Sequence, residues 1–412
     1  MKKKKFKIID KFQNIFVSQS NFKKISKNFS RLFTRLEQDI NDPKKTLYVL
    51  NKDFRFNFNN KDFKKFKSFK TIAIIGMGGS ILGTEAIHDF LKFKIKKKIY
   101  FFDDINIDKI NDIKKKENLK KTLFLIISKS GSTIETITNF LSLNILKKNS
   151  RNIIIISEKN DNILHSMIKK FNLFFIEHKK FIGGRFSVLS EVGIIPSILL
   201  GINIFRLRQN LFKYMKGKEK LILKDNSIKL ASLLLEKKVT NLILLNYLPE
   251  LEKFLSWCQQ LIAESLGKKS KGFLPVISNA PKDHHSMLQL YLDGPKDKVI
   301  NIFSHSTKSK YFLNTKNISK NLHFLHKKEI NQIKISQKEA LIKVLKKKRI
   351  PFREFKIRNI NEETIGQLFS YFIVETILIG KLMKINPFDQ PAVEQVKIYT
   401  KKNLLKNTKY NF

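Results

Sequence analysis

The chain has 412 residues, of which 42% are hydrophobic; this is the composition of a globular protein, with a length sufficient for two or three domains. Its single cysteine, Cys258, excludes an internal disulfide and is typical of a protein of the reducing cytosol. The formal net charge is +46.

This excess of lysine, taken alone, favours a nucleic acid or another polyanion as a partner. The lysines are nevertheless spread from end to end, beside many phenylalanine, isoleucine and asparagine residues, as A+T-rich coding would produce. The densest basic and aromatic run, residues 63–70, directly precedes a predicted strand and has the pattern of a solvent-exposed helix face. We therefore expect no nucleic-acid partner.

The sequence predicts neither a signal peptide nor a membrane span. The basic residues at 1–5 are not followed by an uninterrupted apolar run. The longest apolar segments, residues 194–205 and 371–383, are short or contain Glu375 and Lys381. We expect a cytoplasmic protein with no membrane partner.

Residues 1–45 have the pattern of polar, amphipathic helices. Five short runs rich in isoleucine and phenylalanine follow, separated by helical patterns, which predicts a parallel sheet covered by helices on both faces. The predicted strands are Thr71–Ile75, Lys98–Phe102, Thr122–Ile127, Asn152–Ile156 and Leu173–Ile176.

A lysine-rich helical stretch, residues 204–238, leads to a second α/β unit. Its predicted strands are Leu242–Leu245, Val276–Ile277, Val299–Phe303 and Phe352–Ile357. The resulting organisation is a helical N-terminal segment (1–45), a first α/β domain (46–203), a second (204–383) and a C-terminal tail (384–412). Ligands of parallel sheets bind beyond the carboxyl ends of the strands, so the loops at those ends are the informative ones.

The loop after the third predicted strand is rich in hydroxyl groups and opens a helix. The unpaired N–H groups of a helix N-terminus favour an anion, and a glycine lets the backbone approach it. No Gly-Lys-Ser/Thr follows at P-loop spacing, so the loop suits a single phosphomonoester better than a nucleoside triphosphate. The loop reads Ser128-Lys129-Ser130-Gly131-Ser132-Thr133.

Two further glycine loops follow predicted strands. Gly76-Met77-Gly78-Gly79-Ser80 partly resembles a dinucleotide-binding loop, but its spacing departs from G-x-G-x-x-G, with Ser80 where a third glycine would be wanted. In the second loop, Arg185 follows paired glycines and leads into an apolar helix. An arginine held in this way beside a phosphate loop is suited to stabilise developing negative charge. A helix N-terminal salt bridge is the alternative.

Three segments of the second half also carry chemically suitable side chains. Gln260 and Glu264 share one face of a predicted helix, Leu251–Leu266, although a lone glutamate near a helix end is usually solvated. Adjacent His284 and His285 rarely share one metal ion, and no second ligand pair accompanies them, so we predict no metal site. The tail contains Gln390 and, seven residues later, Lys397.

These motifs, in this order, resemble those of the phosphoglucose isomerase family over about residues 70 to 397. The matching segments are G-x-G-G-S at 76–80, the hydroxyl loop at 128–133, G-G-R-F-S at 183–187, E-S-x-G-K at 264–268, H-S at 285–286 with Gln289 and Gly294 downstream, and F-D-Q-x-A-V-E-x-x-K at 388–397. Glu191 departs from the family, which usually has a small residue there. The resemblance implies two flavodoxin-like, three-layer α/β/α domains of the sugar isomerase (SIS) type.

The resemblance also implies an activity. Family members interconvert glucose 6-phosphate and fructose 6-phosphate through ring opening and a cis-enediol intermediate, in glycolysis and gluconeogenesis, without metal or organic cofactor. They are usually homodimers in which the ring-opening histidine comes from the partner subunit. The sequence leaves open whether mannose 6-phosphate is also a substrate, and whether the fold serves a non-catalytic sugar-phosphate regulator.

By the same resemblance, each motif residue takes a role. Glu264 would carry the proton between C2 and C1, and Arg185 would stabilise the enediolate. His285 and Lys397 would handle ring opening. The substrate-binding residues would be Gly79, Ser80, Ser128, Lys129, Ser130, Thr133, Gln260 and Gln390.

Overall fold

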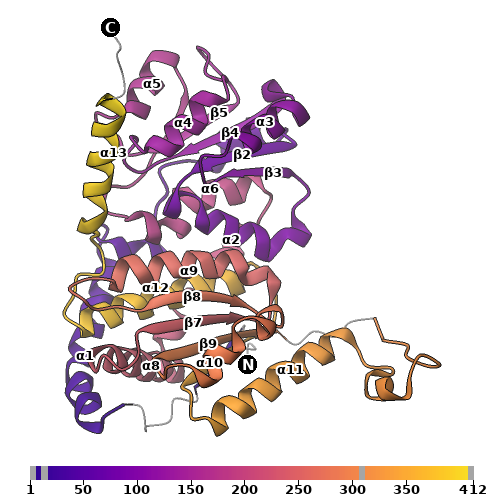
Figure 1. Cartoon of the computed structure of the whole chain (residues 1–412). Helices are drawn as coiled ribbons and strands as arrows, with labels where there is room; N and C mark the ends of the chain where they lie inside the picture. The colour runs from indigo at the N-terminus through magenta and orange to yellow at the C-terminus, as the bar shows by residue number, and fades with distance from the viewer. Residues whose placement is uncertain (1–5, 11–16, 306–310, 407–412) are drawn as a thin grey trace.

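The computed structural model describes residues 6–10, 17–305 and 311–406 (Figure 1). They form two five-stranded sheets with helices around both. The α-helices are α1 (Gln19–Asn41), α2 (Leu82–Leu91), α3 (Ile107–Lys116), α4 (Ile134–Ser142), α5 (Ile163–Phe171), α6 (Glu191–Leu199), α7 (Ile204–Leu207), α8 (Gly217–Leu235), α9 (Glu252–Leu266), α10 (Leu288–Asp293), α11 (Ile330–Lys347), α12 (Glu362–Leu382) and α13 (Glu394–Lys406).

The first sheet is entirely parallel, in the order β3-β2-β4-β5-β6. Every residue of its three central strands is buried, which explains why these strands are continuous runs of isoleucine, leucine and phenylalanine rather than alternating patterns. The strand predictions are confirmed to within one residue at each end. The strands are β2 (Thr71–Gly76), β3 (Lys98–Phe102), β4 (Thr122–Ile127), β5 (Ile153–Ser157) and β6 (Phe174–Glu177).

The second sheet has the order β1-β10-β9-β7-β8, and its last four strands are parallel. The predicted duplication of the α/β plan is confirmed at the level of architecture, and the four predicted strands lie inside the observed ones. The observed strands are β7 (Asn241–Asn246), β8 (Leu274–Asn279), β9 (Lys298–His305) and β10 (Phe352–Ile357).

The prediction that residues 1–45 are helical is right for α1 and wrong for Phe6–Asp10, which form strand β1. This strand pairs antiparallel with β10 at the edge of the second sheet. Phe6 and Ile8 are buried while Lys7 between them is exposed, which is the period of a half-buried strand. The Phe6 ring stacks on Tyr214 with centroids 4.4 Å apart. The lysines at residues 2–5 lie outside the described residues.

The two sheets lie one above the other in Figure 1, with α2 and α9 between them. These two helices pack directly on each other, and α12 packs on α9 from the side of the second sheet. By length and composition α12 could cross a membrane, but 94% of its apolar window is buried inside the molecule. It serves here as the core helix of the second unit.

Two segments lie at the outside of this body; in Figure 1 the first extends away to the right and the second runs along the left side. One is the arm formed by residues 311–330 and the first half of α11, whose exposed large apolar residues include Phe312, Ile318 and Phe324. The other is α13, which has no buried residue. Neither segment is covered by the described part of this chain.

Candidate active site

The hydroxyl loop closes around the N-terminus of α4, as predicted. The Ser128 Oγ atom lies 2.8 Å from Thr133 Oγ1, and Ser130 Oγ lies 3.4 Å from the same atom. Thr133 is the N-cap residue of α4 but makes no side-chain capping bond, so its hydroxyl stays with the other two. The structure thus gathers three hydroxyl groups at the positive end of a helix dipole.

Gly131 shapes this loop through a contact that the sequence reading missed. Its φ is +65°, and a Cβ atom at this position would lie 1.9 Å from Asn162 Oδ1. Asn162 is itself fixed, because its side chain accepts a hydrogen bond from His165 N at the start of α5. The available signal was an asparagine immediately before an apolar helix, which is typical of an N-cap.

Lys129 lies at the side of the loop, where its Nζ atom is 3.5 Å from Glu158 Oε1. It also lies near His178, which is buried at the end of β6. Burial, and then the positive charge of Lys129, lower the pKa of His178 to about 4. His178 is therefore neutral near physiological pH.

The two glycine loops touch each other, backbone to backbone. Gly79 belongs to a 3₁₀ turn, Gly78–Ser80, that follows β2, and a Cβ atom on it would lie 2.2 Å from the carbonyl carbon of Gly184. A Cβ atom on Gly78 would lie 2.7 Å from Gln260 Nε2. These contacts place the first loop against the arginine turn on one side and against α9 on the other. Ser80 is half-buried at the end of the same turn.

Arg185 joins three segments that are far apart in the sequence. Its side chain is 2% exposed, and its Nε atom donates to Ser265 Oγ over 2.9 Å. The Nη2 atom donates to the carbonyl oxygens of Pro387 and Asp389, at 2.7 and 3.0 Å. Burial lowers the pKa of Arg185, while the negative charge of Glu264 acts in the opposite direction. Ser265 was not predicted as a site residue, although it stands next to Glu264 in the matching segment.

Glu264 lies in the last turn of α9 between a cation and an amide. Arg185 Nη1 donates to Glu264 Oε2 over 3.1 Å, and Gln260 Nε2 donates to Glu264 Oε1 over 2.9 Å. Arg185 Nη1 also donates to Gln390 Oε1. The Glu264 side chain is 27% exposed, so a ligand can reach it. The structure therefore brings together the four predicted residues Arg185, Gln260, Glu264 and Gln390.

Gln260 has one polar atom without a partner. Its Oε1 atom is buried and accepts no hydrogen bond from any residue in the described part of the chain. The orientation of the amide follows from its Nε2 atom, which donates to a carboxylate.

The tail segment that carries Gln390 is held against α9 by Lys268. Its Nζ atom donates to Asp389 Oδ1 over 2.7 Å and to the Asn386 carbonyl over 2.5 Å. The hydrogen bond from Lys268 lowers the pKa of Asp389. The helical turn Pro391–Val393 then begins with proline at its first position, where the fixed φ of proline suits the start of a helix. The segments E-S-x-G-K and F-D-Q are therefore neighbours in space.

His285 and Lys397 are not brought to this cluster. His285 is exposed, in the 3₁₀ turn Lys282–His285 after β8, whereas His284 is half-buried and hydrogen-bonded to the Tyr247 hydroxyl over 2.7 Å. Lys397 lies on α13 with its side chain 63% exposed, and its Nζ atom is 2.7 Å from Glu394 Oε1 on the same helix.

The topology separates His285 from Glu264 within one chain. Gln259 Nε2 donates to the carbonyl of Pro275, so the second half of α9 lies over the beginning of β8. Glu264 therefore lies near the amino ends of the strands of the second sheet. His285 follows the carboxyl end of β8, and a six-residue strand is about 20 Å long. The two side chains therefore lie at opposite ends of the strands of the second sheet.

The remaining arrangement combines an anion site with an acid–base site. The hydroxyl loop, the glycine turn and the arginine turn all follow carboxyl ends of strands in the first sheet, where parallel sheets bind ligands. The accessible carboxylate of Glu264 can accept or return a proton, and the buried guanidinium of Arg185 can stabilise a negatively charged oxygen. Such a site suits proton transfer on a phosphorylated substrate.

Comparison with known proteins agrees with this description. A family model described as phosphoglucose isomerase matches residues 51–410. The chain is 32% identical over 402 residues to a probable glucose-6-phosphate isomerase of Methanococcus maripaludis, covering 92% of this chain and 89% of that protein. It is 31% identical over 365 residues to a glucose-6-phosphate isomerase of Methanocaldococcus jannaschii, covering 84% and 87%.

Solved structures show the same fold. A Thermus thermophilus protein described as hypothetical superposes with a TM-score of 0.83 at 23% identity, covering 97% of this chain and 99% of that one. A glucose-6-phosphate isomerase of Chlamydia trachomatis superposes with a TM-score of 0.78 at 16% identity, covering 98% and 89%. Together with the family match over residues 51–410, these relationships establish that the chain belongs to the phosphoglucose isomerase family.

Proposed function

We propose that this chain interconverts glucose 6-phosphate and fructose 6-phosphate, and that Glu264 is its proton-transfer residue. The observation that carries the assignment of Glu264 is its position between Arg185 and Gln260, with 27% of its side chain exposed. The reaction follows from family membership, and the geometry around Glu264 supports the proposal that this residue transfers the proton.

Substrate binding begins at the hydroxyl loop. The hydroxyl groups of Ser128, Ser130 and Thr133 donate to the phosphate, and the free N–H groups at the start of α4 add to the attraction. Lys129 contributes positive charge from the side of the loop. Fixing the phosphate holds the other end of the sugar in one place, so that binding energy serves to position C1 and C2.

Proton transfer follows ring opening. Glu264 removes the proton from C2 of the open-chain aldose, and the electron pair moves toward the C1 carbonyl oxygen to form an enediolate. Arg185 stabilises the negative oxygen, since its guanidinium is held in place before the charge develops. The O2 hydroxyl proton passes to the negative O1 oxygen, and Glu264 returns its own proton to C1, which leaves the ketose with a hydroxyl group on C1. Gln260 and Gln390 orient the sugar hydroxyl groups.

Ring opening requires a proton donor and acceptor at the ring oxygen and at O1. His285 and Lys397 have suitable chemistry, because histidine exchanges protons near neutral pH. His285 and Glu264 lie at opposite ends of the strands of the second sheet. We therefore propose that the His285 of one subunit completes the site of its partner in a homodimer.

Two surfaces support a dimer. The arm defined above exposes Phe312 to 65%, Ile318 to 67% and Phe324 to 68%, and α13 exposes Val396 to 68% and Leu405 to 64%. Exposed apolar residues gathered on projecting segments are typical of protein interfaces. A second copy of this chain is the partner that would also supply the missing histidine.

Mixing two inactive variants tests the shared site. The Glu264→Gln and His285→Ala proteins are unfolded, mixed in equal amounts and refolded together. A shared site gives mixed dimers one intact and one doubly altered site, so about a quarter of wild-type activity returns in a random C2 mixture. If both residues act within one subunit, or if the protein is monomeric, the mixture stays as inactive as its components.

Coupled assays with glucose 6-phosphate, fructose 6-phosphate and mannose 6-phosphate test the activity itself. Turnover of the first two sugars is expected, and no turnover of either would overturn the assignment. Activity on mannose 6-phosphate decides the substrate range that the sequence leaves open. The cytoplasmic location of the protein stays a prediction.

A further inference from the structure

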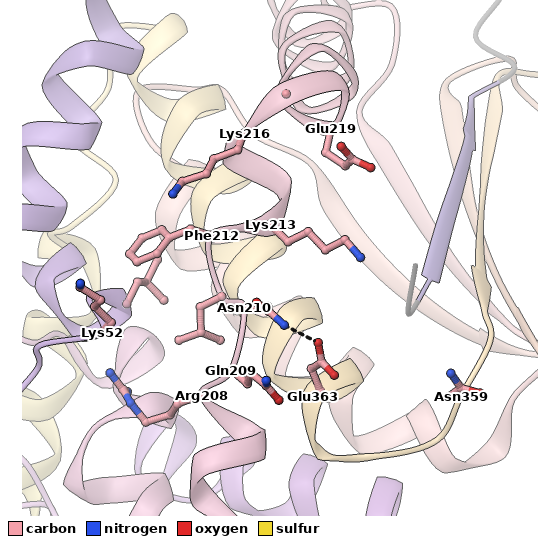
Figure 2. A pocket seen from close by; sticks show the side chains of 13 residues that line it. Lys52, Arg208, Gln209, Asn210, Phe212, Lys213, Lys216, Glu219, Asn359 and Glu363 are labelled. Carbon is pink, nitrogen blue, oxygen red and sulfur yellow. Dashed lines mark hydrogen bonds between the residues drawn. The ribbon is translucent and has the colours of Figure 1, made fainter. Parts of the chain in front are cut away.

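One pocket of the molecule lies away from the residues of the catalytic site. Figure 2 shows this pocket, which has a volume of about 870 Å³. It opens between the chain that follows Leu50, the connection from α7 to α8, and the loop between β10 and α12. None of its lining residues belongs to the hydroxyl loop, the arginine turn or the Glu264 cluster.

Positive charge gathers on one side of this pocket. In Figure 2 Lys216 lies above the Phe212 ring and Lys52 and Arg208 lie below it, whereas Lys213 extends away to the right, on the side of Glu219 and Glu363. We call the part of the pocket bounded by Lys52, Arg208 and Lys216 the cationic lobe. A smaller adjoining cavity of about 410 Å³ shares Lys52, Phe212 and Lys216, and Glu37 and Asp53 also line it.

The arginine of the cationic lobe is fixed by the fold. Arg208 Nη1 donates to the carbonyl of Leu189 over 2.5 Å, and Nη2 donates to the carbonyl of Asn51 over 2.9 Å. Its guanidinium also lies 5.2 Å from the centroid of the Phe54 ring. Burial lowers the pKa of Arg208 to about 10, so the group is charged at neutral pH. A fixed cation that uses two of its five N–H groups for these carbonyls can donate others to a ligand.

The two lysines of the cationic lobe are not neutralised by the part of the chain that the structure describes. Within residues 6–10, 17–305 and 311–406, the Nζ atoms of Lys52 and Lys216 have no hydrogen-bond or ion-pair partner, and both side chains are exposed. Lys216 is also the N-cap residue of α8, a 19-residue helix with no side-chain cap, and Gly217 at its start lines the pocket. The unpaired N–H groups there add to the positive field.

Two carboxylates, Glu219 and Glu363, also line the pocket, and Figure 2 shows both on the side of Lys213. Glu363 accepts hydrogen bonds from Asn210 Nδ2 over 2.7 Å and from Gln367 Nε2 over 3.0 Å, and it lies on the side of Lys213. Like charges held near one another repel, and an anion with two or more charges bound between them would relieve the repulsion.

We propose that the cationic lobe is a binding site for a small anion with at least two negative charges, such as a phosphorylated or polycarboxylate metabolite. Lys52 and Lys216 supply the mobile charges, and Arg208 supplies the fixed one. Because Arg208 is tied to Leu189, at the end of the turn Gly184–Leu189 that carries Arg185, the ligand would rest beside an element of the catalytic site without entering it.

Pyrophosphate and citrate are suitable probes, since they carry similar charge on different groups. Binding is measured by calorimetry at physiological salt, in a protein carrying Ser130→Ala and Thr133→Ala so that the hydroxyl loop does not contribute. Adding Lys52→Gln and Lys216→Gln is expected to weaken the Kd by about tenfold or more, because charge-assisted hydrogen bonds are lost. Comparing the two probes distinguishes a phosphate site from a carboxylate site.

The matched control is Lys114→Gln with Lys115→Gln in the same background, which removes two exposed charges from α3. This pair is expected to leave the Kd within about twofold of the parent, since exposed charges beyond a Debye length are screened. Equal weakening by both pairs would show that the probes sense only the overall charge of +46, and no binding of either probe would also overturn the proposal. With the hydroxyl loop intact, the Lys52 and Lys216 variants should retain isomerase activity.

Discussion

Arg185 Nη1 lies 3.1 Å from Glu264 Oε2, although 79 residues separate the two in the chain. The cation is held by four further acceptors, from Ser265, Pro387, Asp389 and Gln390. Among the residues that the structure describes, one other residue, Gln260, holds the carboxylate. The arginine side chain is thus held in place, whereas the glutamate side chain has fewer contacts and can move. This arrangement suits a residue that transfers a proton beside a stationary positive charge.

The contact between the two glycine loops predicts that an alanine substitution destabilises the protein more at Gly79 than at Gly184. Gly79→Ala should destabilise the protein by about 1–3 kcal/mol, because its Cβ would lie 2.2 Å from the Gly184 carbonyl carbon and the backbones would have to separate. Gly184→Ala places its Cβ 3.9 Å from Gly79 Cα and should cost less than about 1 kcal/mol. Chemical denaturation measures both. Equal losses would contradict the described packing of the loops.

The hydroxyl loop predicts a loss of preference for phosphorylated ligands. Replacing Ser130 and Thr133 together by alanine removes two donors to a dianion, each worth roughly 1.5–3 kcal/mol. KM should rise strongly and kcat should fall, while the free energy of unfolding changes by only about 1 kcal/mol per hydroxyl. Ser132→Ala is the control.

The measurement for this loop is inhibition by a sugar-phosphate analogue and by its unphosphorylated counterpart. The double variant should discriminate between the two far less than wild type, and Ser132→Ala should discriminate as well as wild type. If the double variant keeps the full preference, the phosphate binds elsewhere.

His178 predicts an acid-sensitive component of stability. Burial and Lys129 lower its folded-state pKa from 6.5 to about 4, so the unfolded chain binds the proton more readily in this interval. The contribution of His178 is therefore present above pH 6.5 and is lost as the pH falls toward 4, by about 3 kcal/mol in total.

His178→Gln should flatten the decline in the free energy of unfolding between pH 6.5 and 4. His323→Gln, at an exposed histidine, should leave the slope unchanged. An identical slope in wild type and His178→Gln would show that His178 titrates normally in the folded protein.

The strands were predictable where both faces of the sheet are buried, because such strands consist of apolar residues throughout. β4 is Thr122–Ile127 in both the prediction and the structure, because a short uninterrupted apolar run bounded by polar residues is typical of a buried strand. β1 was not predictable from its own five residues. Its partner β10 lies more than 340 residues later, and a short strand among lysines has a stronger local resemblance to a polar helix.

The individual site residues were predictable from the sequence, but the contacts that bring them together were less so. The resemblance to the family assigned the roles of Glu264 and Arg185. Nothing local shows that their side chains meet, because the contact depends on the packing of α9 against α2 and on the tail. Asn162 was missed because its role is to limit the space around Gly131, a packing role that leaves no chemical pattern. The separation of His285 from Glu264 follows from the direction of β8, which only the fold supplies.

The central claim is that Glu264 moves a proton between C2 and C1. The most direct measurement follows isomerisation in D₂O, recording both the rate and the deuterium at these carbons, for wild type, Glu264→Gln and the control Glu252→Gln at an exposed position of the same helix. We predict solvent deuterium in the wild-type and Glu252→Gln products. In Glu264→Gln, kcat and deuterium exchange should fall together by about 10²–10⁴-fold with little change in KM. Isomerisation without any deuterium, or a Glu264→Gln protein that keeps more than about a tenth of its activity, would contradict the account.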